Sequence, residues 1–88
     1  MTDWTLISFV TASTTRLEVM RCLAKLTQTP KDLSMALDIH ISHISRALSE
    51  LSKKGLVQCM NPKDKKWKYF ALTEKGKSLL EEITALRK

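Results

Sequence analysis

Small polar side chains and one arginine recur along residues 41–54 at the spacing of a single helix face. The members of this face are Ser42, Ser45, Arg46, Ser49 and Lys53, with His43 beside them. An arginine has the donors to bond guanine O6 and N7 together, and serines are small enough to let a helix approach base edges closely. The histidine is expected to donate to a base edge or a phosphate. These residue types therefore predict a helix that reads the major groove of duplex DNA.

Lysines gather on the segment that follows this helix. The letters "NPKDKK" at residues 61–66 begin with the turn-forming pair Asn-Pro and contribute Lys63, Lys65 and Lys66, and Lys68 lies just beyond. The flanking stretches "GLVQCM" and "WKYFAL" are rich in aliphatic and aromatic residues, which predicts strands at 56–59 and 67–72. We expect a hairpin over 56–72 whose ammonium groups attract phosphates, largely without regard to base sequence. Trp67 is expected to pack against the hairpin or a second copy.

The net charge of +6 is concentrated in one window of the chain. Residues 40–68 hold seven basic and two acidic side chains, whereas residues 1–39 hold four of each sign. Such segregation is typical of a face that meets a polyanion. At the start of the segment 30–37, free amide groups beside Lys31 are expected to hold another phosphate.

Five helices are predicted to position these groups, at residues 4–12, 14–26, 30–37, 41–54 and 74–86. The residues that cap helix starts are Asp3, Ser13, Thr29 and Thr73, and Pro30 suits a first helical position. Asp38 is expected to take a left-handed turn, with Ile39 tucked between helices and His40 near the next cap. Gly55 suits the end of the 41–54 helix. Gly76 is expected to weaken the last helix by about 1 kcal/mol relative to alanine.

This order of elements is that of a mainly α winged helix-turn-helix with a small β-hairpin. The stretch from residue 14 to residue 80 resembles the DNA-binding domain of ArsR-type and MarR-type regulators, especially small archaeal ones. The letters "HISRALSELSKKGLV" and "YFALTEKGK" carry most of the resemblance. It implies a recognition helix at 41–54 and a wing that touches phosphate or enters the minor groove. The length of the chain allows one domain, over residues 1–88. Regulation is expected to be of the repressor kind, with activation as the alternative.

The terminal helices carry more apolar residues than one small core is expected to need. The residues in question are Ile7, Phe9, Val10, Leu79, Ile83 and Leu86. They are predicted to form a two-fold dimer interface, as the flanking helices of the resembled regulators do. The simpler alternative is that the two helices only cover each other.

Other classes of function have weaker support. We expect no enzyme, because the chain lacks a nucleophile beside a base, a glycine-rich phosphate loop, and a carboxylate pair other than Glu81 and Glu82. No cofactor or metal is expected: His40 and His43 share a helical spacing, but no C-x-x-C pair accompanies them. A cytoplasmic location is expected from the lack of a signal sequence and of a membrane-spanning apolar run. A protein-interaction module in a larger assembly, or an RNA binder, remain as alternatives.

Overall fold

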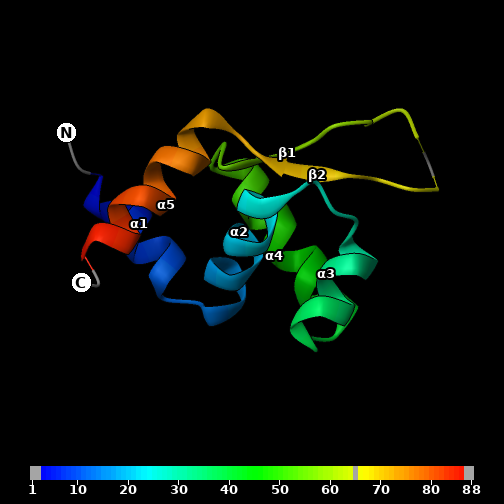
Figure 1. The fold of residues 1–88 in the computed structure, drawn as a ribbon, viewed down its shortest axis with the longest axis horizontal. Helices are drawn as coiled ribbons and strands as arrows, with labels where there is room; N and C mark the ends of the chain where they lie inside the picture. The colour runs from blue at the N-terminus through cyan, green and yellow to red at the C-terminus, as the bar shows by residue number, and fades with distance from the viewer. Residues whose placement is uncertain (1–2, 65, 87–88) are drawn as a thin grey trace.

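The computed structural model describes residues 3–64 and 66–86. The elements are α1 (Trp4–Thr11), α2 (Thr14–Lys25), α3 (Pro30–Leu37), α4 (Ile41–Lys53), β1 (Val57–Cys59), β2 (Phe70–Leu72) and α5 (Glu74–Leu86). Figure 1 shows α1 and α5 together at one end of the molecule and α2 and α4 in the middle, with the β1-β2 hairpin extending toward the other end above α3. This is the winged helix-turn-helix architecture that was predicted.

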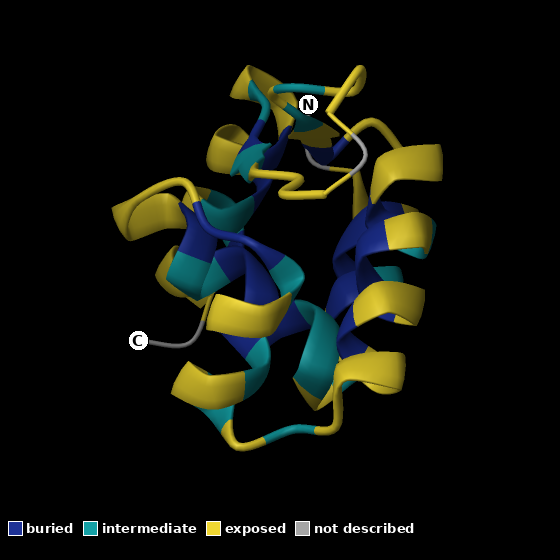
Figure 2. Cartoon of the chain, turned by 90° about the vertical axis from the view of Figure 1, so that its right-hand side faces the viewer, coloured by how far each residue is buried: buried dark blue, intermediate teal, exposed yellow. Residues whose placement is uncertain are grey.

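One apolar core joins the helices. Its largest fully buried side chains include Met20 of α2, Leu33 of α3, and Ile44, Leu48 and Leu51 of α4. The three residues of α4 follow a spacing of four and three, which places them on one side of the helix. In Figure 2 the buried segments of neighbouring helices face the interior and the exposed segments face outward. The buried stripe of α4 therefore fixes which of its sides remains for other contacts.

Side chains cap the helix starts as the sequence predicted. The Asp3 carboxylate accepts a hydrogen bond from the backbone amide of Leu6 at 3.0 Å, and the Ser13 hydroxyl accepts one from the backbone amide of Arg16 at 3.3 Å. Thr29 and Asp32 form a reciprocal capping box at the start of α3. Each cap satisfies an amide that has no partner inside its helix.

A left-handed residue separates α3 from α4. Asp38 has φ 54° and ψ 47°, as predicted, and Ile39 packs against the core. Chain direction changes within Asp38, Ile39 and His40, so α3 and α4 meet at a tight turn. Gly55, at φ 74°, ends α4 in the same left-handed region.

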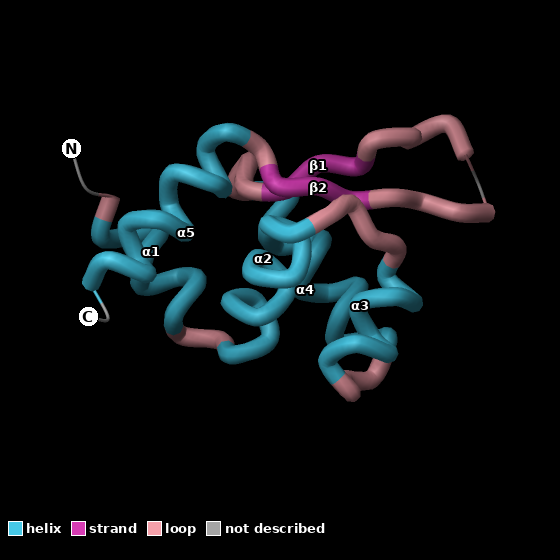
Figure 3. The backbone as a smooth tube through the Cα atoms, viewed as in Figure 1, coloured by secondary structure: helices cyan, strands magenta, loops and turns pink. Residues whose placement is uncertain are grey.

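The two paired strands of the hairpin are shorter than the sequence predicted. β1 and β2 pair antiparallel, with Val57 opposite Leu72 and Cys59 opposite Phe70. Leu56 and residues 67–69 were predicted to lie in strands but fall outside them. Figure 3 shows strand only at the base of the wing, and loop along the rest. Beyond the strands, the Met60 amide donates to the Tyr69 carbonyl at 2.7 Å. The Asn61 side chain donates to the carbonyl of Trp67 at 2.6 Å and accepts from the amide of Tyr69 at 2.8 Å.

The connection between α2 and α3 is attached to the base of the wing. Gln28 and Phe70 exchange two backbone hydrogen bonds, of 3.1 and 2.8 Å. The Gln28 side chain also donates to the carbonyl of Cys22 at 3.0 Å. This isolated bridge holds the start of α3 beside the hairpin.

Four of the six residues predicted to form a dimer interface are core residues of one copy. Ile7, Val10, Leu79 and Ile83 have exposed fractions of 7%, 0%, 4% and 1%. These four side chains are covered within one copy, as in the simpler alternative: α1 and α5 contact each other, and both also pack against α2. Phe9 is half-buried against the core, and Leu86 is 52% exposed.

Candidate nucleic-acid interface

The outer side of α4 is exposed and polar. All six predicted contact residues of this helix reach solvent, namely Ser42, His43, Ser45, Arg46, Ser49 and Lys53. The side chain of Arg46 is 80% exposed. The buried stripe of α4 and this polar side are separate, so the helix has a continuous surface for a ligand.

His40 caps α4 with its ring. Its Nδ1 atom accepts from the amide of Ser42 at 3.1 Å and lies 2.8 Å from the Ser42 hydroxyl oxygen. Accepting from the amide requires the ring proton to sit on Nε2. The His40 ring therefore has a structural task in addition to the contact role predicted for it.

The start of α3, the start of α4 and the wing border one groove. Its volume is about 380 Å³, and its lining residues are Thr29, Pro30, Lys31, Ile41, Ser45, Lys66, Trp67 and Lys68. Four of these residues were predicted contacts from three separate segments of the sequence: Lys31, Ser45, Lys66 and Lys68. The fold brings them to the rim of one concave surface.

Sequence reasoning missed the apolar part of this groove. Trp67 is 53% exposed and Ile41 is 45% exposed, although the tryptophan was expected to pack against the hairpin or a second copy. Within one copy, about half of the Trp67 surface remains exposed and the residue lines the groove. Ile41 lies three residues before Ile44, the first residue of the buried stripe, yet it lines the groove.

The wing lysines surround an ordered turn. Lys63, Lys66 and Lys68 are exposed, whereas Lys65 lies outside the described residues. The Asp64 carboxylate accepts hydrogen bonds from the amides of Trp67 at 3.0 Å and Lys66 at 2.8 Å. These bonds, that of Trp67 first, hold the pKa of Asp64 below its ordinary value because they stabilise the ionised form.

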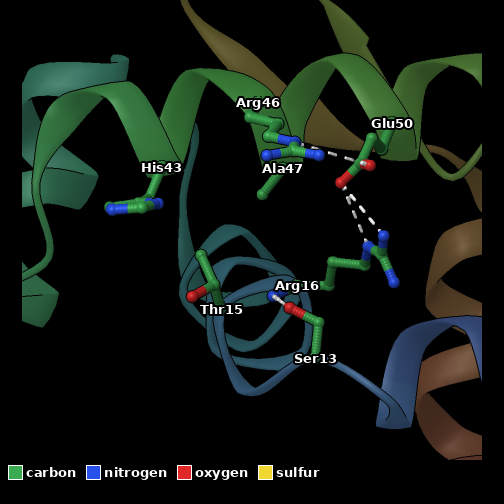
Figure 4. Close-up of a pocket in the computed structure, with 7 residues that line it drawn as sticks. All are labelled: Ser13, Thr15, Arg16, His43, Arg46, Ala47 and Glu50. Carbon is green, nitrogen blue, oxygen red and sulfur yellow. Dashed lines mark hydrogen bonds and ion pairs between the residues drawn. The ribbon is translucent and has the colours of Figure 1, made fainter.

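A second hollow lies on the other flank of α4, against the start of α2. It measures about 210 Å³ and is lined by Ser13, Thr15, Arg16, His43, Arg46, Ala47 and Glu50. In Figure 4 the Glu50 carboxylate lies between the side chains of Arg46 and Arg16. The contribution of α2 to this surface was not predicted.

One signal in the sequence did point to Arg16. A cation in the first turn of a helix is placed unfavourably against the helix dipole, so a nearby acidic partner would stabilise it. Arg16 follows the Ser13 cap by three residues, and its partner is Glu50 at 3.1 Å. The identity of that partner lay beyond sequence reasoning, because it is 34 residues away.

The two histidines stand without a metal-binding set around them. Their rings are 6.3 Å apart in an edge-to-face arrangement. Across residues 3–64 and 66–86, His, Cys, Asp and Glu side chains form no group of three that could hold a metal ion. Over the same ranges, every helix is too short or too polar to span a membrane.

Comparison with known proteins assigns this sequence to a family. The sequence profile of the HVO_A0261 N-terminal domain matches residues 4–88. The chain belongs to the HVO_A0261 N-terminal domain family. A curated relative of this family member is the HTH-type transcriptional regulator YdgG of Bacillus subtilis (strain 168). The two are 39% identical over 57 residues, which cover 61% of this chain and 38% of YdgG.

Solved structures show the same fold. This HVO_A0261-type domain superposes on the adhesin competence repressor AdcR of Streptococcus pyogenes with a TM-score of 0.75 at 26% identity, over 85% of this chain and 57% of AdcR. For MarR of E. coli the TM-score is 0.76 at 26% identity, over 84% and 56% of the two chains. For BldR of Sulfolobus solfataricus it is 0.76 at 25%, over 85% and 55%. The fold is therefore that of MarR-type winged-helix regulators, and the chain spans less than two thirds of each relative's length.

Proposed function

We propose that this chain binds duplex DNA in a sequence-specific manner as a transcriptional regulator. In this proposal α4 enters the major groove, and the wing lies on the backbone or in the adjacent minor groove. The observation that carries the proposal is the shared groove, where Lys31 of α3, Ser45 of α4 and Lys66 of the wing border one concave surface. Three elements on one surface fit a ligand that is long, curved and anionic.

The dimensions and chemistry of α4 support the proposed orientation. An α-helix with its side chains is about 10–12 Å across, and the major groove of B-DNA is about 12 Å wide. Serines at three exposed positions of α4 keep that side of the helix narrow. Arg46 then projects a guanidinium beyond them, which suits the O6 and N7 acceptors of guanine.

The wing supplies the part of the attraction that does not depend on sequence. Lys63, Lys66 and Lys68 are exposed around the Asp64 turn. Lys65 is proposed as a further contact from its position in the sequence. Phosphate contacts by ammonium groups release counterions, so this part of the binding weakens steeply as salt rises.

The relatives support regulation of gene expression. YdgG is described as an HTH-type transcriptional regulator and AdcR as a repressor. We extend the repressor role to this chain: a protein that occupies a promoter blocks the polymerase without needing a further activity. The same relatives are not described as enzymes, which is consistent with a binding protein.

The proposed active form is a homodimer. Trp4 at the start of α1 and Leu86 at the end of α5 are 61% and 52% exposed, on the helices that lie away from the wing (Figure 1). A second copy that covers these side chains through a two-fold axis would present two α4 helices to successive major grooves, about 34–36 Å apart. Sedimentation equilibrium at tens of micromolar protein tests this, and a pure monomer that still protects a pseudo-palindromic site would contradict it.

A fluorescence titration tests the function itself. The protein is titrated against labelled duplex DNA, duplex RNA and single-stranded DNA at two salt concentrations. We expect tightest binding to duplex DNA, weaker at high salt, because the A-form major groove of RNA is too narrow for α4. Equal affinity for the three nucleic acids, or no binding at low salt, would overturn the proposal and favour a protein-interaction module.

A further inference from the structure

One carboxylate on the proposed DNA-binding surface is shared by two arginines. Glu50 Oε1 lies 3.1 Å from Nη2 of Arg16 and accepts a hydrogen bond from Nε of the same arginine at 3.3 Å. Glu50 Oε2 lies 4.0 Å from Nε of Arg46. The two oxygens thus face different partners, one on α2 and one on α4, as Figure 4 shows.

Arg16 is held in place by contacts other than Glu50. Its Nη1 donates to the carbonyl oxygen of Phe9 at 2.8 Å, and its guanidinium carbon lies 4.1 Å from the centre of the Phe9 ring. Its side chain is only 19% exposed. A guanidinium fixed by a carbonyl, a ring and a carboxylate has little freedom, so Arg16 fixes the position of Glu50 in turn.

A carboxylate at this position needs an explanation on a surface that meets phosphates. Glu50 is 32% exposed and lies one helical turn from Arg46, so by itself it would repel DNA. Arg16, on α2, neutralises that negative charge through its ion pair with Glu50. What remains is a fixed acceptor beside the Nε edge of Arg46, and this contact leaves the two terminal nitrogens of Arg46 for a ligand.

An arginine without such a neighbour would lose many side-chain rotamers on binding a base. Ordering a long side chain costs entropy, and a contact that orders it beforehand reduces that cost. At 4.0 Å and with Arg46 80% exposed, the Glu50 contact is loose enough to restrict the side chain without burying it.

We infer that Glu50 is a positioning residue that directs the Arg46 guanidinium toward bases, and that Arg16 holds Glu50 for this task. The inference rests on the proposed DNA-binding function and names the specificity device of that site. It also connects the end of α1, through Phe9 and Arg16, to the base-reading side of α4.

The substitution Glu50→Gln tests it, because the amide keeps the shape but loses the charge that attracts arginine. The preferred duplex is first found by selection from a random library, and affinities are then measured for it and for a duplex with one guanine replaced. Arg46→Ala is expected to reduce this discrimination by about tenfold. Glu50→Gln is expected to reduce it at least ~threefold while raising affinity for random duplexes, since the Arg16 charge is then no longer neutralised on a surface that meets phosphates.

Three further variants separate positioning from simple electrostatics. Glu81→Gln removes the same charge from an exposed position of α5, and should leave discrimination unchanged. In the double variant Arg46→Ala with Glu50→Gln, discrimination should equal that of Arg46→Ala alone, because Glu50 acts through Arg46. Arg16→Gln should reproduce the loss seen with Glu50→Gln.

Three results would overturn the inference, and they differ in what they leave standing. If Arg46→Ala reduces discrimination and Glu50→Gln does not, the positioning role fails and the proposed function stands. If Glu50→Gln changes the preferred base even in the Arg46→Ala background, Glu50 itself contacts a base, such as the amino group of cytosine. If the unmodified protein prefers no duplex, both the inference and the proposed function fail. Thermal melts of each variant confirm that it is folded before its affinity is compared.

Discussion

The backbone of Gly76, in the first turn of α5, lies directly against the carbonyl group of Leu56. A Cβ atom built on residue 76 would overlap the Leu56 carbonyl oxygen and stand 3.2 Å from Cδ2 of Leu72. The same Leu56 oxygen accepts a hydrogen bond from the amide of Thr73 at 3.1 Å. This glycine therefore allows α5 to approach the base of the wing, which corrects the expectation that it merely weakens its helix.

We expect Gly76→Ala to destabilise the protein by about 1–3 kcal/mol, because backbone must move to relieve the overlap. The gain of ~1 kcal/mol in helix propensity is too small to offset a shift of the Leu56 carbonyl. Urea denaturation measures the change, with Ser78→Ala on the same helix as the matched control. A Gly76→Ala variant as stable as the control would show that α5 can move away from Leu56 at little cost.

The elements predicted correctly from sequence are those set by neighbours along the chain. A helix cap requires only a side-chain oxygen and an amide three residues later, so Asp3, Ser13 and Thr29 were identifiable. The core side of α4 follows from the helical repeat alone. The left-handed turn at Asp38 required only a residue type that tolerates positive φ.

The incorrect predictions concern contacts that no local repeat of the sequence shows. Leu79 and Ile83 were expected at an interface, since their burial inside one copy is not visible in the repeat. The length of β2 depends on where Asn61 bonds across the loop, and the role of Gly76 depends on Leu56. Likewise, helical periodicity gives the face on which Glu50 lies but not Arg16 as its partner.

The cap of α4 leads to a second prediction. We expect His40→Ala to cost about 1 kcal/mol of unfolding free energy, because the amide of Ser42 loses its acceptor, whereas His40→Ser should restore most of it. His43→Ala, one turn later and exposed, serves as the control and should change stability by less than ~0.5 kcal/mol. Equal losses from His40→Ala and His43→Ala in thermal melts would argue against capping by the ring.

The turn of the wing should respond to acid through Asp64. Its pKa is lowered in the folded chain by the amides of Trp67 and Lys66, so its stabilising effect is complete above the ordinary aspartate value. That effect is lost as pH falls through the lower, folded pKa. An NMR titration should show the carboxylate ionising at lower pH than in an unstructured peptide of residues 59–70, with the two amide resonances moving together with it. A titration that matches the peptide would mean that the turn does not hold in solution.

Base reading and phosphate attraction should separate in two single substitutions. Arg46→Ala removes a donor from α4 and should lower the discrimination between preferred and altered duplexes by roughly tenfold, with a smaller change in binding to random DNA. Lys66→Ala on the wing should weaken binding to all duplexes alike and reduce the slope of log affinity against log salt by about 1. Lys77→Ala on α5 removes the same charge from a helix that has no residue among those lining the groove, and should alter neither quantity appreciably. If Arg46→Ala and Lys66→Ala instead gave the same uniform loss, Arg46 would be contacting phosphate, and the sequence preference would have to come from the shape of the DNA rather than from its base edges.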